Sequence, residues 1–287
     1  MYFAERDRFA DEGVSGMTRQ PIEVAFERRG NGSPLVLLHG IGHRWQAWAP
    51  VLDLLSEQHD VIAVDLPGFG KSPLLPEGRG YDISSAVDAL ADIFDDLGLD
   101  HPHVAGNSLG GVLALEAASR GLVASATALA PAGFWSPRDR AYALWVLRRI
   151  RSTGRFPAPL RTLLFGNRFF RAVGASLLYG HPSRMTAEIM LDDLVSMVGS
   201  PAFDLVATAG KGYAYASPAP TVPVTVAWGT RDRILWPRQA RRAAELLPQA
   251  RHVWLHRAGH VPMIDEPEQV ASLITATCSQ ASAREAA

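Results

Sequence analysis

Short apolar runs alternate with amphipathic stretches along most of this chain. Apolar runs bounded by glycine, proline or polar residues are typical of strands in a buried sheet. We expect strands at Ile22–Phe26, Leu35–Leu38, His103–Ala105, Ala124–Leu129, Val222–Gly229 and Arg251–Leu255. Helical patterns are found at Leu109–Ala118 and Arg238–Leu247. This alternation predicts an α/β fold with a mostly parallel central sheet flanked by helices.

The most informative motif follows the apolar run at His103–Ala105. Residues 106–110 read Gly-Asn-Ser-Leu-Gly, a G-x-S-x-G turn that lifts a serine hydroxyl out of the end of a strand. The serine backbone in such a turn is strained, and flanking glycines let the strand and helix approach without a clash between Cβ atoms. An ordinary glycine-rich turn is the alternative interpretation. The strand-like and helix-like flanks favour Ser108 as a nucleophile.

Two further residues complete the arrangement that this chemistry requires. A serine needs a base within hydrogen-bond reach and an acid that orients the base, and the order along such chains is serine, acid, histidine. Asp232 follows the run Val222–Gly229, and His260 follows the run Arg251–Leu255. Ser108, Asp232 and His260 therefore all lie past the C-terminal ends of strands, where open α/β sheets place their sites.

Other acids and histidines compete for these roles. Asp265 and Glu266 lie closer to His260 in sequence, but they precede Pro267 and resemble residues at the start of a helix. The run Ala124–Leu129 is followed by Ala-Pro-Ala and offers no acid. Of the nine histidines, only His260 combines a position after the last strand with a preceding glycine. We therefore predict Asp232 as the acid and His260 as the base.

Acyl transfer also needs donors for the oxyanion of its tetrahedral intermediate. The residue after the nucleophile, Leu109, begins a helix whose dipole adds positive potential, so its backbone N–H is one expected donor. The sequence His-Gly-Ile-Gly at 39–42 follows the very apolar run Leu35–Leu38. There the N–H of Ile41 is the expected second donor.

These motifs together resemble the α/β-hydrolase fold family over residues 21–276. They are His-Gly-Ile-Gly at 39–42, Asp-Leu-Pro-Gly-Phe-Gly-Lys-Ser at 65–72, Gly-Asn-Ser-Leu-Gly-Gly at 106–111, Asp232, and Gly-His at 259–260. The resemblance implies a hydrolase without a cofactor, with Ser108 as nucleophile, His260 as general acid/base and Asp232 as its partner. Related epoxide hydrolases and haloalkane dehalogenases carry aspartate at the elbow, so Ser108 argues against both.

Between residue 132 and the strand at Val222 lie about eighty residues, far more than the roughly 10–12 that a crossover requires. Their pattern predicts helices at Arg138–Arg151, Pro159–Gly174 and Met185–Val198. In the family such an insertion, after the sixth strand, is a cap. We expect a cap at 134–217 and a core at 17–133 and 218–287. Candidate pocket walls are Trp45, Asn107, Phe134, Trp135, Trp145, Phe165, Phe169 and Phe170. For the six aromatic residues of the cap, packing between cap and core is the favoured alternative.

Charge is concentrated in the first half of this expected cap. From Phe134 to Arg171 there are nine arginines and one acid, Asp139, although the net charge of the whole chain is −1. A solvated helix face is one interpretation. The other is a positive entrance at Arg148 and Arg149, or a face that makes weak contact with anionic membranes.

The remaining composition fits a soluble catalytic domain. No apolar run approaches the length of a membrane span, and the polar start does not resemble a secretory signal. The one cysteine, Cys278, cannot form an internal disulfide, so we expect a cytoplasmic protein. Residues 1–16 are expected to be a disordered extension, with Met17 as the natural start. We expect no cofactor, metal or nucleic-acid partner, and no pattern indicates an oligomer.

The sequence thus predicts a serine hydrolase of small to medium, largely apolar acyl esters, thioesters or lactones. The asparagine before the serine, Asn107, is similar to the residue at that position in hydrolases that split carbon–carbon bonds of ring-cleavage products. Those have a tryptophan after the histidine, where this chain has Val261, and this favours the ester class. Acyl transfer, perhydrolysis and a non-catalytic ligand-binding protein remain alternatives.

Overall fold

The computed structural model describes residues 19–285, so the expected extension at 1–16 and the start at Met17 lie outside the described residues. Its strands are β1 (Phe26–Arg29), β2 (Ser33–Leu38), β3 (His59–Val64), β4 (His103–Asn107), β5 (Ser125–Leu129), β6 (Val224–Gly229) and β7 (Arg251–Leu255). Its helices are α1 (Ala49–Ser56), α2 (Ile83–Asp96), α3 (Leu109–Ser119), α4 (Pro137–Gly154), α5 (Ala158–Gly166), α6 (Arg168–Ala175), α7 (Ala187–Gly199), α8 (Phe203–Ala209), α9 (Arg238–Leu246), α10 (Pro262–Asp265) and α11 (Pro267–Glu285). Two short 3₁₀ helices are η1 (Trp45–Trp48) and η2 (Pro182–Arg184).

The strands form one sheet in the order β1-β3-β2-β4-β5-β6-β7. All neighbours pair in parallel except β1, which runs antiparallel to β3. The predicted α/β fold with a mostly parallel sheet is confirmed. Because the strands are parallel, their C-terminal ends share one edge of the sheet, and the loops that follow β2, β4, β6 and β7 meet there.

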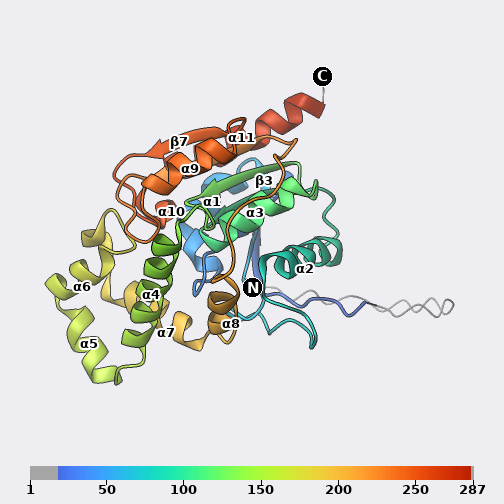
Figure 1. Ribbon diagram of the computed structural model, residues 1–287. Coiled ribbons are helices and arrows are strands. Elements are labelled where there is room, and N and C mark those ends of the chain that lie inside the picture. The colour runs from blue at the N-terminus through green and yellow to red at the C-terminus, as the bar shows by residue number, and fades with distance from the viewer. Residues whose placement is uncertain (1–18, 286–287) are drawn as a thin grey trace.

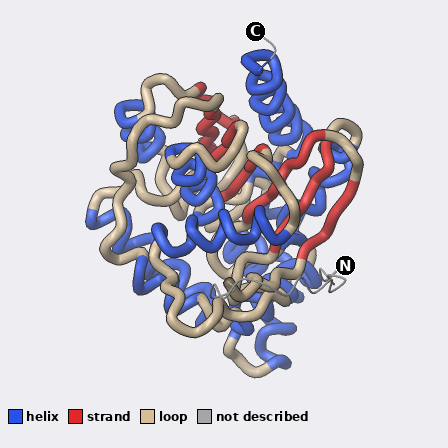
Figure 2. Tube along the Cα trace, turned by 90° about the vertical axis from the view of Figure 1, so that its right-hand side faces the viewer, coloured by secondary structure: helices blue, strands red, loops and turns tan. Residues whose placement is uncertain are grey.

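Alternate residues of the central strands enter two separate cores. Leu35 and Leu37 of β2 pack in one cluster with residues of α1 and α11, whereas Val36 and Leu38 pack in another with residues of α2 and α3. The period of two in a strand requires this division. Helices therefore cover both faces, and α11 extends beyond the strands to the end marked C in Figure 2.

Residues 137–209 contain the helices α4 to α8 and lie between β5 and β6 in the chain. Figure 1 shows these helices gathered beside the C-terminal edge of the sheet, at the lower left. The insertion follows the fifth strand of the described residues, rather than the sixth. We call residues 137–209 the helical insertion.

One predicted strand is misplaced. The run Ile22–Phe26 does not form the first strand, which instead spans Phe26–Arg29. Ala25 is held outside the ladder, because its N–H donates to the Ser72 hydroxyl and its carbonyl accepts from the N–H of Asp65. The apolar side chains of Ile22 and Val24 are nevertheless buried. Burial of this segment without strand pairing explains the apolar pattern.

Candidate active site

Ser108 occupies the sharp turn between β4 and α3. Its φ is 55° and its ψ is −109°, a conformation that is strained for any residue with a side chain. The Ser108 N–H donates to the carbonyl of Leu129 on β5 at 2.9 Å, which fixes the turn against the neighbouring strand. A Cβ on Gly106 would lie 2.0 Å from the Gly110 oxygen, and one on Gly110 would lie 2.1 Å from the Leu38 oxygen. Both glycines are therefore required by close approach of backbone, as the sequence indicated.

Asp232 and His260 form a buried pair at the ends of β6 and β7. Nδ1 of His260 lies 2.8 Å from Oδ2 of Asp232, and both side chains are almost inaccessible to solvent. The other carboxylate oxygen of Asp232 accepts from the N–H groups of Ile234 and Leu235, each at 2.8 Å. Because the carboxylate accepts at Nδ1, it favours the tautomer with the proton on Nδ1 and leaves Nε2 able to accept a proton.

The backbone of His260 is held by the helical insertion and by β4. Its N–H donates to the carbonyl of Leu178 at 2.6 Å, and its carbonyl accepts from Nδ2 of Asn107 at 2.9 Å. The same Asn107 amide donates to the carbonyl of Leu129 at 3.1 Å. The side chain before Ser108 therefore ties together the ends of three strands, a role that no sequence pattern indicated.

Asp265, the rival acid in the sequence, has a different position. Its carboxylate accepts the backbone N–H groups of Gly259 at 2.8 Å, Gly180 at 2.8 Å and His181 at 2.9 Å. It thereby fastens the loop that carries His260 to the helical insertion. Glu266 bonds to the ring of His181 at 2.9 Å. Neither acid reaches the imidazole of His260 in the described structure, so Asp232 alone holds that ring.

The loop after β2 lies directly against the elbow. A Cβ on Gly40 would stand 3.3 Å from the Cβ of Ser108. The buried ring of His39 fixes this loop, since its Nδ1–H donates to the Gly40 carbonyl at 2.8 Å and its Nε2 accepts from the N–H of Leu66 at 2.9 Å. Burial lowers the pKa of His39 to about 3, so the ring is neutral and can keep both bonds.

Two backbone donors near Ser108 have no acceptor within the described residues. They are the N–H groups of Ile41, in the loop after β2, and of Leu109, the first residue of α3. The N-terminus of α3 adds positive potential at the second donor. Unpaired backbone N–H groups are uncommon away from water. Their arrangement around the elbow suits an anionic oxygen.

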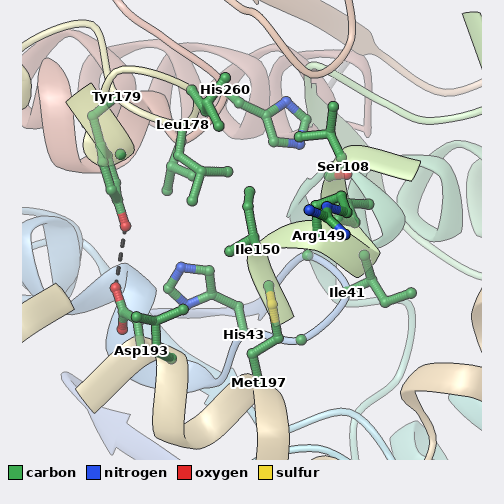
Figure 3. Close-up of a pocket in the computed structure, with 18 of the residues that line it drawn as sticks. Ile41, His43, Ser108, Arg149, Ile150, Leu178, Tyr179, Asp193, Met197 and His260 are labelled. Atoms are coloured by element: carbon green, nitrogen blue, oxygen red, sulfur yellow. Dashed lines mark hydrogen bonds between the residues drawn. The ribbon is translucent and has the colours of Figure 1, made fainter. Parts of the chain in front are cut away.

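A cavity of about 430 Å³ extends from Ser108 into the helical insertion. Figure 3 shows Ser108 and His260 side by side at one end of it, with Ile41 below them. Most of the lining is apolar, and Ile150, Leu178, Met190, Leu194 and Met197 contribute to it. Polar groups are few: at the far end Tyr179 donates to the Asp193 carboxylate at 3.1 Å. Burial raises the pKa of Tyr179, and the Asp193 carboxylate raises it further, so the phenol stays protonated.

The expected pocket walls divide into two groups. Asn107, Trp145 and Phe165 line the cavity, although Trp145 is largely exposed at its rim. Trp135 lines a second cavity of about 60 Å³ that also reaches Ser108, Ile41 and Leu109.

Four expected walls do not line either cavity. Phe134 is buried against Tyr215, with ring centroids 4.9 Å apart. Trp45 donates its backbone N–H to Asp65 and packs with the core beside α1. Phe169 and Phe170 point into solvent, with exposed fractions of 67% and 53%. None of the four is therefore a wall of these cavities, and Phe134 has the packing role that was the favoured alternative. The aromatic pattern alone does not reveal which way a side chain turns.

Comparison with known proteins extends the picture. The model of the alpha/beta hydrolase family matches residues 35–273. Lipase 3 of a Moraxella species is 25% identical, covering 84% of this chain and 76% of its own length. 2-Hydroxy-6-oxo-2,4-heptadienoate hydrolase of Pseudomonas putida is 42% identical over 102 residues, 34% of this chain and 37% of its own. A thermophilic esterase from Thermogutta terrifontis superposes with a TM-score of 0.70 at 24% identity, covering 92% of this chain and 96% of its own, and this likeness establishes the fold.

Proposed function

The chain belongs to the alpha/beta hydrolase family, and from that premise we propose that it is a serine hydrolase of carboxylic esters. The observation that carries the proposal is the 2.8 Å bond between Asp232 and Nδ1 of His260, which leaves Nε2 free beside a strained serine. A buried imidazole held in this tautomer is a general base, and Ser108 is the hydroxyl next to it.

The geometry supports a two-step reaction. Ser108 Oγ attacks the acyl carbonyl while Nε2 of His260 takes the hydroxyl proton, and the carbonyl oxygen becomes an oxyanion. The free N–H groups of Ile41 and Leu109 would bind that oxyanion, and each such donor is worth about 10²–10³ in rate. The tetrahedral intermediate expels the alcohol, which takes the proton from His260. Water then attacks the acyl-enzyme with His260 again as base, and the acid and free Ser108 are released.

The cavity sets the class of substrate. Its volume of about 430 Å³ falls within the range of small-molecule sites, and its lining is largely apolar. We infer an acyl group of small to medium length that lies among Ile150, Leu178 and Met197. Thioesters and lactones present the same carbonyl to Ser108 and belong to the same proposal.

Hydrolysis of a carbon–carbon bond is the second candidate. It is favoured by the similarity to the Pseudomonas putida 2-hydroxy-6-oxo-2,4-heptadienoate hydrolase and by Asn107 before the serine. Against it, buried Val261 follows His260 at the cavity wall. The carbon–carbon bond hydrolases that Asn107 indicates typically have tryptophan at that position. The two candidates share the nucleophile and differ in the substrate that is consumed.

A labelling experiment tests the proposal. The protein is treated with a fluorophosphonate probe and analysed by mass spectrometry, beside turnover of p-nitrophenyl esters from acetate to decanoate. We expect one adduct, on Ser108, and a loss of turnover of at least about 10³-fold in Ser108→Ala. The optimum chain length should fall in the short to medium range that the cavity accommodates.

Ser196→Ala is the matched control. Ser196 lies on α7, and its buried hydroxyl has no hydrogen-bond partner among the described residues, so its removal should change neither labelling nor turnover. Absence of both the adduct and ester turnover would overturn the ester proposal. Consumption of 2-hydroxy-6-oxo-2,4-heptadienoate, with no turnover of any ester, would establish the second candidate instead.

A further inference from the structure

Exposed apolar side chains gather in one part of the helical insertion. We call residues 155–173, which include α5 and most of α6, the cap hairpin. Of the large apolar side chains that are exposed in the described residues, six lie in this short segment: Phe156, Leu160, Leu163, Phe169, Phe170 and Val173. Leu163 is 72% exposed, and the rings of Phe169 and Phe170 contact each other at 5.8 Å. Gathered apolar exposure of this kind marks an interaction surface.

The two helices turn few of their residues inward. Only Phe165 of α5 and Ala175 of α6 are buried. Phe165 and Gly174, the residue that directly follows the hairpin, line the cavity that contains Ser108, so the inner side of the hairpin borders that cavity. Figure 1 shows α5 and α6 at the outer corner of the insertion, away from the sheet. The outer side of the hairpin is therefore apolar and unpartnered, while its inner side borders the candidate site.

Positive charge surrounds the exposed apolar residues. The cap hairpin contains Arg155, Arg161, Arg168 and Arg171 and no acidic residue. Arg161 donates to the carbonyl of Gly154, and Arg171 donates to the carbonyls of Phe165 and Met185. Within the described residues, none of these four guanidinium groups is paired with a carboxylate.

Most of the nearby acids are already paired with other residues. Asp139, the one acid between residues 134 and 171, is held by Arg238 and Arg242 from outside the insertion. On α7, which packs against α5, Asp192 pairs with Arg44 and Asp193 accepts from Tyr179. Glu188 is the remaining acid of α7. The hairpin thus keeps an excess of positive charge at an apolar surface.

We propose that the cap hairpin docks on an anionic phospholipid surface. Its phenylalanines and leucines enter the acyl layer, and its arginines contact the phosphate groups, as in interfacial amphipathic helices. A second copy of the chain is disfavoured, since two such surfaces would bring like charges together. No helix of the described residues is long and apolar enough to cross a bilayer, so the contact is with the surface. Docking would place the wall of the cavity against the lipid.

The test is vesicle sedimentation with the full chain, wild type and Ser108→Ala. Vesicles are phosphatidylcholine alone or phosphatidylcholine mixed with phosphatidylglycerol. We expect binding to the anionic vesicles that exceeds binding to the neutral ones by about tenfold or more, weakened strongly at about 0.5 M salt. Ser108→Ala should bind equally, because docking does not depend on the proposed hydrolysis.

Two double variants separate the apolar and charged contributions. Phe169→Ala with Phe170→Ala should weaken binding to anionic vesicles by about tenfold, and Arg155→Gln with Arg168→Gln by a similar factor. The matched controls are exposed residues of α9 and β7, outside the helical insertion. Leu246→Ala with Trp254→Ala removes exposed apolar side chains, and Arg241→Gln with Arg251→Gln removes exposed charge. These controls should bind as wild type. Circular dichroism melting and ester turnover in solution should be unchanged in all four.

Five results would overturn the proposal. Equal binding to both kinds of vesicle, or no binding to either, would exclude an anionic lipid surface as the partner of the cap hairpin. Binding that the hairpin variants leave unchanged would place the contact elsewhere. A dimer in sedimentation velocity that the phenylalanine variant dissociates, without vesicle binding, would identify a second copy as the partner. Salt-sensitive binding to polyglutamate, with no vesicle binding, would indicate an acidic protein.

Discussion

The C-terminal edge of the sheet and the helical insertion differ in how far their side chains are buried and in how they are held. At the edge, Ser108, Asp232 and His260 are buried, and each is held by hydrogen bonds to backbone: Ser108 to a neighbouring strand, Asp232 to its own loop and His260 to the insertion. In the insertion, many large apolar side chains face solvent and several arginines bond only to carbonyl groups. The sheet edge is typical of a rigid scaffold that fixes reacting groups. The insertion is typical of a surface that selects which molecules reach those groups.

Backbone hydrogen bonds join the two regions, beside ion pairs such as Arg44 with Asp192. His260 N–H donates to Leu178 of the insertion, and Asp265 binds Gly180 and Gly259 across the junction. A change in the insertion can therefore alter the shape of the cavity while the sheet keeps the reacting groups in place. This difference predicts that substitutions at the edge act mainly on rate or folding, and those in the insertion act mainly on selectivity.

The largest effect is expected at Asp232. In Asp232→Asn, Oδ1 can still accept from Ile234 and Leu235, but the amide now donates toward Nδ1 of His260. The ring must then carry its proton on Nε2 and loses its capacity as base, so kcat should fall on the order of 10³–10⁴-fold. Ester turnover measured beside circular dichroism melting would separate this loss from unfolding.

Asp265→Asn is the matched change at the rival acid. One oxygen of Asp265 becomes an amide donor, and one or two of the three backbone N–H groups lose their acceptor. We expect a loss of about 1–3 kcal/mol in the free energy of unfolding and a far smaller loss of kcat. If Asp265→Asn removed turnover while Asp232→Asn retained it, the assignment of the two acids would have to be reversed.

Glycines give the second contrast between the regions. In Gly110→Ala the new Cβ would lie 2.1 Å from the Leu38 oxygen, which is backbone and cannot move aside. We expect a loss of at least about 3 kcal/mol in the free energy of unfolding, or no folded protein. In Gly166→Ala, at the end of α5, nothing lies within 4 Å of the new Cβ. This change should stabilise the protein by up to about 1 kcal/mol.

Urea unfolding measures both glycine variants. Equal losses in the two would show that the elbow is no more constrained than the insertion. Ser108 labelling of whatever Gly110→Ala folds adds a second measurement, because a displaced elbow should react more slowly. The Gly166→Ala protein should be labelled at the wild-type rate.

The same contrast explains what the sequence could reveal. The sheet edge could be predicted because its constraints are local: a strained turn needs glycines at positions 106 and 110, and Asp232 and His260 lie in the loops that follow β6 and β7. The order of serine, acid and histidine then limited the choice. The strand at Ile22–Phe26 was misplaced because its apolar residues are buried without pairing, and burial alone does not distinguish these cases.

The cavity walls were less predictable because their orientation is a tertiary property. Phe134 and Phe169 are both aromatic residues of the predicted cap, but one is buried under Tyr215 and the other is exposed. The carbonyl of Leu178, which holds His260, carries no signal in a side-chain pattern. Asp265 offered a carboxylate near the histidine, but its three backbone partners are visible only once the loops are folded together.

The pH dependence of stability provides a smaller effect at the edge. Burial lowers the pKa of His39 to about 3, whereas an unfolded histidine titrates near 6.5. Between these values the unfolded chain binds a proton that the folded protein excludes, so stability falls as the pH falls. From pH 6.5 to pH 5 the expected loss is about 1.6 kcal/mol. Urea unfolding at several pH values across this range would measure the loss. In His39→Gln, the free energy of unfolding should fall less between pH 6.5 and pH 5, by about that amount. An equal loss in wild type and variant would contradict the assignment of this pH dependence to His39.

The smallest effect is expected at Arg149, on the rim of the cavity. Its side chain lines the cavity and is exposed, with no carboxylate partner in the described residues. A substrate whose acyl chain ends in a carboxylate would meet this charge, and because water screens an exposed pair the gain is only a few-fold. In Arg149→Gln, kcat/KM for p-nitrophenyl hemisuccinate should fall about two- to fivefold relative to p-nitrophenyl butyrate. Arg148→Gln removes the neighbouring charge, which does not line the cavity of Ser108, and should leave the ratio unchanged. An equal response of both esters to Arg149→Gln would mean that the arginines of the insertion act only outside the cavity, leaving selectivity to its apolar walls.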